Sequence, residues 1–310
     1  MGRALSFVLG ALVTLGAAGA HSEVWQPSPG HTQLPLWPAA VPDSQPVPGP
    51  EDVTTARRNE WVAGRPWRYV QNVSTPTLTV YPPRGRNTGA AVVVFPGGGY
   101  QILAIDLEGT EACDWLASRG ITAVLLKYRV PCRVVGPHRE CPMALMDAQR
   151  AMGVVRLHAR DWHVDPHKLG VLGFSAGGHM VAALSTQYEQ RLYAPVDAAD
   201  RESCRPDFAV ALYPGHLADP DEGFVLNPDV HVTARTPPTF LVQAEDDPVD
   251  PVENSLVYFA MLRKAGVPAE LHVFPRGGHA FGLRRTERPI TRWPELVETW
   301  LRGLGVIAAR

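Results

Sequence analysis

A serine stands between glycines at residues 173–177, which read "GFSAG", and this serine directly follows the apolar run "KLGVLGF" at 168–174. A glycine inside a strand or a helix costs roughly 0.5–1 kcal/mol relative to alanine, so local stability does not favour this composition. A sharp strand-to-helix turn does favour it, because a β-carbon at either glycine would clash with the neighbouring strand or helix. Such a turn lifts the hydroxyl clear of the backbone at a helix N-terminus. We therefore predict that Ser175 is a nucleophile.

An acidic residue and a histidine follow two later apolar runs. Asp246 lies in "FLVQAEDDPVDP" after the run at 239–244, and His279 lies in "VFPRGGHAFG" after the run at 270–275. The order serine, acid, histidine is the one expected when the serine stands on a strand-to-helix turn, and it differs from the orders in chymotrypsin and subtilisin. The sequence thus indicates nucleophilic catalysis, in which Ser175 attacks, His279 moves the proton and Asp246 orients the imidazole.

Three glycines follow another apolar run, in "VVVFPGGGY". Acyl transfer needs backbone N–H groups directed at the oxygen that becomes negative, and residues without side chains let the chain approach this oxygen closely. We predict that the amides of Gly98 and Gly99, together with that of Ala176, form such an oxyanion hole. A phosphate-binding loop is the alternative interpretation, but no Gly-Lys-Ser/Thr follows and the dinucleotide fingerprint is missing.

The elements that must position these residues are apolar runs that alternate with helical patterns. The runs are expected to be strands at 90–95, 122–128, 168–174, 207–213, 239–244 and 270–275. The helical patterns cover 111–120, 144–159, 179–188, 252–266 and 292–305. This alternation predicts an α/β fold with a mostly parallel central sheet and helices on both faces. The carboxyl ends of its strands are where chemistry gathers, and the candidate residues all follow strands.

Composition excludes some partners. The chain has 310 residues, 19% of them charged, and a formal net charge of −2. Neither a basic patch nor a strong field of one sign points to nucleic acid.

The first sixty residues precede the alternating pattern. Residues 1–20 combine one arginine, an uncharged apolar stretch and Ala-Gly-Ala at 18–20, which favours a signal peptide cleaved before His21. A membrane anchor is the alternative, but the run is short for a span. Residues 21–60 are rich in proline and predict an extended arm laid on the domain through Trp37, so 61–310 would be the catalytic domain. We therefore expect an exported protein, periplasmic or extracellular, without a stable membrane anchor.

Export permits disulfides, which makes the four cysteines informative. Cys132 and Cys141 flank a loop-like stretch, and we predict that they are linked. Cys113 and Cys204 are either two buried thiols or a second bridge. No CxxC motif or paired histidine spacing indicates a metal site.

The chain also resembles a known family, the secreted α/β-hydrolase esterases related to acetyl xylan esterases, in the prolyl-oligopeptidase and dienelactone-hydrolase-like superfamily. The resemblance extends from about Leu34 to Leu304. It is carried by "FPGGGYQILA", "EGTEACDWLASRGITAVLLKYRVP", "DAQRAMGVVR", "LGFSAGGHMVAALST", "RPDFAVALYPG", "EDDPVDPVENS" and "GVPAELHVFPRGGHAFGL".

The resemblance implies the α/β-hydrolase fold and hydrolysis of acyl esters, often acetyl esters of sugars, without a metal or organic cofactor. It also favours Asp246 over Asp247, because in similar chains the acid stands three residues before an apolar residue, here Val249. The loop begins Pro96-Gly97 where many lipase-like relatives have His-Gly. A small exopeptidase and a non-catalytic binding protein on the same scaffold are the alternative functions.

The sequence also suggests which ester is cleaved. A lipase needs an amphipathic lid, and the connection between the runs at 207–213 and 239–244 is polar and rich in proline. We therefore expect a short acyl group such as acetyl. Tyr100, Gln101, Tyr213 and His216 follow strand ends and are candidates for contact with a small-molecule or carbohydrate ester. For Tyr213, packing in the core is the favoured alternative.

Overall fold

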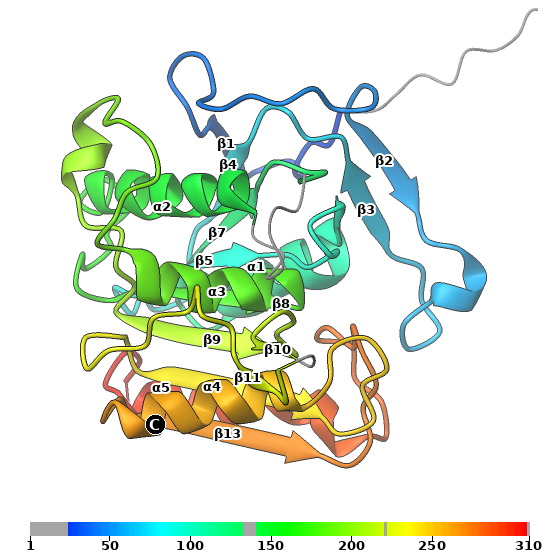
Figure 1. Ribbon diagram of the computed structural model, residues 1–310. Coiled ribbons are helices and arrows are strands. Elements are labelled where there is room, and N and C mark those ends of the chain that lie inside the picture. Colours follow the sequence, from blue (N-terminus) through cyan, green and yellow to red (C-terminus); the bar gives the residue numbers. More distant parts are fainter. Residues whose placement is uncertain (1–23, 133–140, 220–221, 309–310) are drawn as a thin grey trace, which may run out of the picture.

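A single eight-stranded sheet forms the centre of the computed structural model, which describes residues 24–132, 141–219 and 222–308 (Figure 1). The spatial order of its strands is β1-β4-β7-β5-β8-β9-β12-β13. Their bounds are Thr32–Pro35 (β1), Thr77–Tyr81 (β4), Ala91–Phe95 (β5), Thr122–Lys127 (β7), Leu169–Phe174 (β8), Phe208–Leu212 (β9), Thr239–Ala244 (β12) and Ala269–Phe274 (β13). Every pairing from β7 to β13 is parallel, whereas β4 pairs antiparallel with β1 and β7. All six predicted strands and their parallel arrangement are thereby confirmed.

Helices cover both faces of this sheet. Their bounds are Glu111–Ser118 (α1), Pro142–Leu157 (α2), Ala176–Gln187 (α3), Glu253–Lys264 (α4) and Trp293–Gly303 (α5). In Figure 1, α2, α3 and α4 lie in front of the sheet. Helices α1 and α5 share the other face, where the rings of Trp115 and Trp293 meet edge to face at 5.5 Å. The buried strand side chains are therefore packed on both sides, as their unbroken apolar sequences predict.

Short elements surround this core. A three-stranded sheet combines β2 (Asp52–Thr55), β3 (Arg68–Gln71) and β6 (Ile102–Leu103), and a hairpin combines β10 (Ala218–Asp219) with β11 (Val225–Leu226). A π-helical turn, η2 (Ile105–Thr110), precedes α1. The remaining turns are the 3-10 helices η1 (Arg58–Glu60), η3 (Ala198–Arg201) and η4 (Pro289–Arg292).

The proline-rich arm contributes a strand to the central sheet. Its residues Thr32–Pro35 form β1, which pairs with β4 and so makes β4 an inner strand. Trp37 is buried, and its indole N–H donates to Asp147 at 2.9 Å while the Arg150 guanidinium lies over its ring. Residues 21–23 and the predicted signal peptide at 1–20 lie outside the described residues.

The cysteines show one bridge. Cys132 and Cys141 form a disulfide, which confirms the predicted pairing, and Cys113 and Cys204 are buried free thiols. Among the helices that the structure describes, none is both long and apolar enough to span a membrane.

Candidate active site

The site lies where the order of the sheet strands reverses. The chain moves from β5 outward to β7 and then returns to the other side of β5 with β8, so the loops after β5 and β8 diverge at this point. Such a switch point at the carboxyl ends of parallel strands leaves a crevice for a ligand. The glycine-rich segment 96–99 follows β5, and Ser175 follows β8.

Ser175 stands on a strained turn between β8 and α3. Its φ of 52° and ψ of −119° are rare for a residue with a side chain. A β-carbon at Gly173 would lie 2.1 Å from the carbonyl oxygen of Gly177, and one at Gly177 would lie 2.1 Å from that of Phe95. The two glycines are therefore required by close backbone approach, as the sequence predicts, and the turn leaves the hydroxyl at the start of α3.

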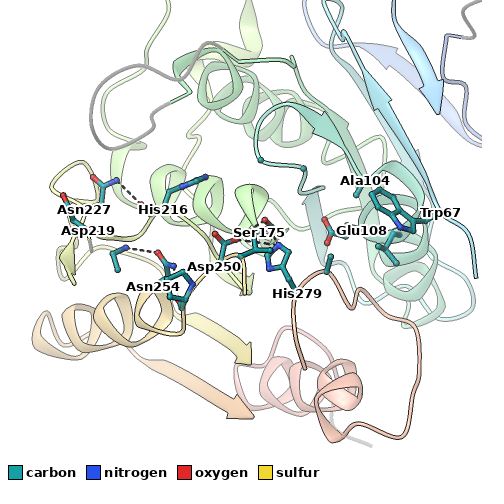
Figure 2. A pocket seen from close by; sticks show the side chains of 17 residues that line it. Trp67, Ala104, Glu108, Ser175, His216, Asp219, Asn227, Asp250, Asn254 and His279 are labelled. Atoms are coloured by element: carbon teal, nitrogen blue, oxygen red, sulfur yellow. Dashed lines mark hydrogen bonds and ion pairs between the residues drawn. The ribbon is translucent and has the colours of Figure 1, made fainter. Parts of the chain in front are cut away.

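Three side chains form a continuous hydrogen-bonded row through this turn. His279 Nε2 lies 3.0 Å from Ser175 Oγ (Figure 2). On the other side of the ring, His279 Nδ1 lies 2.8 Å from Asp247 Oδ2. Both contacts are within the range in which a base accepts a proton from a nucleophile and a carboxylate holds the base. The predicted pairing of Ser175 with His279 is present in the structure.

The carboxylate in this row corrects the sequence prediction of Asp246. The side chains of Asp246 and Asp247 point to different partners after β12: Asp246 Oδ1 accepts hydrogen bonds from the backbone N–H groups of Gly277 and Gly278, both at 2.7 Å. These bonds lower the pKa of Asp246 and fix the loop that carries His279. Asp247 instead directs one oxygen to the imidazole and the other to the backbone N–H groups of Val249 and Asp250.

The electrostatic surroundings of His279 favour its protonated form. Burial alone would lower its pKa, but the hydrogen bond and the negative charge of Asp247, with the charges of Asp250 and Glu108, outweigh burial and raise the pKa. The ring of Tyr213 packs edge-on against the imidazole at 5.0 Å. The site therefore stabilises a protonated imidazole at His279.

The glycine-rich loop lines the same cleft through Gly98 and Gly99. Their φ values of 131° and 60° are left-handed, and a β-carbon at Gly98 would lie 2.2 Å from the carbonyl oxygen of Ile102. Ala176 is the first residue of α3, where backbone N–H groups have no partner within the helix. The chain thus brings the amides predicted for the oxyanion hole to loop and helix ends beside Ser175, and their role remains a prediction.

A buried glutamate that the sequence analysis did not identify holds this loop. Glu108 Oε2 accepts from the N–H of Gly97 at 2.8 Å, and Oε1 accepts from the hydroxyl of Tyr213 at 2.8 Å. The Tyr213 oxygen also accepts from the N–H of Gly282 at 3.2 Å. Burial raises the pKa of Glu108. Tyr213 lies 105 residues away in the sequence, so no local pattern distinguishes Glu108 from an exposed helical glutamate.

The cleft has a volume of about 700 Å³ and two chemically different ends. At one end, here called the polar end, it is lined by His216, Asp219, Asn227, Asp250 and Asn254. Trp67 and Ala104 lie at the opposite end, with Ser175 and His279 between the two (Figure 2). A substrate seated at the serine can therefore extend toward hydrogen-bonding groups on one side and an indole ring on the other.

Of the four candidate substrate contacts, only His216 lines this cleft. Tyr100 and Tyr213 are buried in the core, where their hydroxyls bond to His179 Nδ1 and Glu108. Gln101 donates to the carbonyl of Cys132 instead. The candidate role of Tyr100 is therefore not supported, and Tyr213 packs in the core, as its alternative interpretation predicts.

The described residues contain no group of three or more His, Cys, Asp or Glu side chains arranged to hold a metal ion.

The chain is similar to known proteins in sequence and in fold. Residues 148–303 match the model of the prolyl oligopeptidase family, and residues 78–215 match a second model, BD-FAE. The crystal structure of an acetyl ester-xyloside bifunctional hydrolase from Caldicellulosiruptor lactoaceticus is 33% identical, with a TM-score of 0.70, and the alignment covers 89% of this chain and 97% of that one.

Two curated relatives are larger proteins. An acetylxylan esterase from Xylanibacter ruminicola is 32% identical over 63% of this chain and 42% of the relative. An endo-1,4-beta-xylanase B from Butyrivibrio fibrisolvens is 31% identical over 78% of this chain and 40% of the relative. The chain thus spans about two fifths of the length of these relatives. Its fold, its serine turn and these matches together show that the chain is an α/β-hydrolase that belongs to the prolyl oligopeptidase family, among relatives of acetylxylan esterases.

Proposed function

We propose that the protein is a serine ester hydrolase that removes short acyl groups, acetyl above all, from hydroxyl groups of carbohydrates. The observation that carries this proposal is the row from Ser175 Oγ through His279 to Asp247, with contacts of 3.0 and 2.8 Å. It lies in a cleft with a hydrogen-bonding end, and the matched proteins named above include an acetylxylan esterase and an acetyl ester-xyloside hydrolase.

The proposed reaction has two steps, acylation of Ser175 and hydrolysis of the acyl-enzyme. Ser175 Oγ attacks the ester carbonyl while His279 Nε2 takes the hydroxyl proton, and Asp247 holds the imidazolium through Nδ1–H. The N–H groups of Gly98, Gly99 and Ala176 would stabilise the negative oxygen. His279 then gives its proton to the leaving alcohol oxygen, and an acyl-enzyme remains. Water, deprotonated by the same imidazole, releases the acid and restores Ser175.

The preference for a short acyl group follows from what covers the cleft. The connection from β9 to β12 is where this fold would carry an amphipathic lid, and its described residues form only the two-residue strands β10 and β11. Without a helical apolar face, this connection offers little surface to a long acyl chain. The polar end suits an alcohol with several hydroxyl groups.

The Cys132–Cys141 disulfide supports the further proposal that the protein is exported, because disulfides persist outside a reducing cytosol.

The proposal is tested by acetate release from acetylated xylan and from simple acetyl esters, with Ser175→Ala as the control. We expect the variant to lose activity by several orders of magnitude and to retain its fold by circular dichroism. Nitrophenyl esters from acetyl to dodecanoyl should show the highest kcat/KM at the short end. Highest activity on long chains would make a lipase the better description, and cleavage of peptide nitroanilides in preference to esters would favour the exopeptidase alternative.

A further inference from the structure

A second carboxylate, which the row described above does not use, touches the nucleophile. Asp250 Oδ2 accepts the hydroxyl of Ser175 at 3.1 Å and lies 3.7 Å from His279 Nε2. The residue is largely buried and lines the cleft at its polar end. Figure 2 shows its side chain between Ser175 and the polar groups of His216 and Asn254.

This carboxylate competes with the base for one proton. A serine hydroxyl has a single hydrogen to donate, and it has two acceptors here: His279 Nε2 at 3.0 Å and Asp250 Oδ2 at 3.1 Å. Only the arrangement that directs the hydrogen to His279 leads to attack. While the hydroxyl donates to Asp250, its hydrogen points away from His279 Nε2 and the base cannot take it.

Two hydrogen bonds hold the main chain of Asp250 in place, and a close main-chain contact restricts its carboxylate. Its N–H donates to Asp247 Oδ1 at 3.0 Å, and its carbonyl oxygen accepts from Gln243 Nε2 at 2.9 Å. On the other side, a β-carbon at Gly215 would lie 2.4 Å from Asp250 Oδ1, so the main chain packs directly against the carboxylate. The carboxylate is therefore fixed beside the reaction centre, and it releases Ser175 when another hydrogen-bond donor reaches it.

The location of Asp250 identifies that donor. The leaving alcohol oxygen must approach His279 Nε2 to receive its proton, and Asp250 Oδ2 is 3.7 Å from this nitrogen on the side of the polar end. A hydroxyl on the carbon next to the ester would reach the carboxylate from the substrate. We infer that Asp250 is a specificity-determining residue that accepts a hydrogen bond from a hydroxyl vicinal to the scissile ester, so that the Ser175 hydroxyl donates its hydrogen bond to His279 instead.

This inference rests on the proposed function and narrows its substrate class to esters of vicinal diols, such as partly acetylated sugars. An ester without the neighbouring hydroxyl leaves the carboxylate bonded to the serine. Attack on such an ester then requires the Ser175 hydroxyl to leave Asp250 with no substrate hydroxyl to replace it, so we expect the hydroxylated substrate to be preferred by about tenfold or more in kcat/KM.

The experiment compares two substrates of nearly equal size: a methyl xyloside monoacetate with a free hydroxyl on the neighbouring carbon, and the same compound with that hydroxyl methylated. For the wild type, we expect the preference given above. In Asp250→Asn the preference should shrink, and in Asp250→Ala it should fall to about one. The value of kcat/KM for the methylated compound should be kept or raised in Asp250→Ala, because the competing acceptor is gone.

Asp246→Asn is the matched control, because it removes a neighbouring carboxylate that does not line the cleft. Its preference between the two compounds should equal that of the wild type. The preference is a ratio of two kcat/KM values, so it does not depend on the fraction of a variant that is folded. The wild-type preference can be measured even if a variant fails to fold. Equal kcat/KM of the wild type for both compounds, or an unchanged ratio in both Asp250 variants, would overturn the inference while ester hydrolysis stands. A wild type that hydrolyses no acetyl ester, nitrophenyl acetate included, would overturn the proposed function as well.

Discussion

Two adjacent aspartates give a sharp test of the site, because the structure assigns them different partners. Asp247→Asn replaces the carboxylate that faces His279 Nδ1 at 2.8 Å. The amide nitrogen of asparagine donates where the carboxylate accepts, so the imidazole is held in the tautomer that carries its proton on Nε2. That nitrogen then has no lone pair for the hydroxyl of Ser175. The variant retains a nucleophile and a histidine of the right shape but has no general base.

The magnitude follows from the role of this contact. Loss of the correct tautomer in a serine triad lowers kcat by about 10⁴-fold, which corresponds to about 5 kcal/mol of transition-state stabilisation. Asp246→Asn should cost less than about tenfold, because the amide oxygen of asparagine still accepts from the N–H groups of Gly277 and Gly278. We expect the two variants to differ by at least about a hundredfold.

The assay is initial-rate hydrolysis of nitrophenyl acetate by both variants at one pH, with thermal unfolding as the check on folding. If Asp246→Asn lost more activity than Asp247→Asn, the assignment of Asp247 would be refuted and the sequence-based choice of Asp246 restored.

Three further outcomes follow from the buried contacts. Glu108→Gln should lower activity less than Glu108→Ala, since the amide oxygen can still accept from Gly97 and only the Tyr213 hydroxyl loses its acceptor, whereas Glu108→Ala should lose at least about tenfold by leaving both groups unpaired; equal activity of the two variants would contradict this. Asp147→Ala should lower the free energy of unfolding by about 3–5 kcal/mol in urea titrations, because it strands the buried Arg129 guanidinium, and a loss below about 1 kcal/mol would contradict a structural role for the pair. Because the base must be neutral and the pKa of His279 is raised, kcat/KM should fall with decreasing pH at a midpoint above the ordinary histidine value of about 6.5, and a rate flat down to pH ~4 would exclude His279 as the base.

The parts of the site that follow from local sequence were predicted correctly in their positions. The serine turn needs two glycines within five residues, and the clash distances at Gly173 and Gly177 show why no other residue serves. His279 lies in a glycine-rich loop after a strand, and the parallel order of the sheet brings this loop to the same edge as Ser175. Patterns of short range were sufficient here because the chemistry depends on where strands end.

The remaining features depend on contacts between distant segments. Asp246 and Asp247 are neighbours in one loop, and only the position of the loop at 277–279 decides which carboxylate meets the imidazole. The strand at 32–35 has no alternating pattern and forms because β4 offers it an edge. Tyr100 and Tyr213 follow strands, as binding residues often do. Both side chains are nevertheless buried, because their hydroxyls form hydrogen bonds with the buried residues His179 and Glu108.

The buried contacts of Glu108 also connect the two loops that must act together. One of its oxygens fixes Gly97, at the start of the loop predicted to hold the oxyanion, and the other reaches Gly282 through the hydroxyl of Tyr213, three residues beyond His279. A displacement of either loop would break a hydrogen bond at a buried carboxyl group, which is costly where no water can replace the partner. This carboxyl group belongs to a π-helical turn that packs on the sheet. The turn therefore holds both the loop that carries His279 and the loop with the expected oxyanion donors in fixed positions relative to each other.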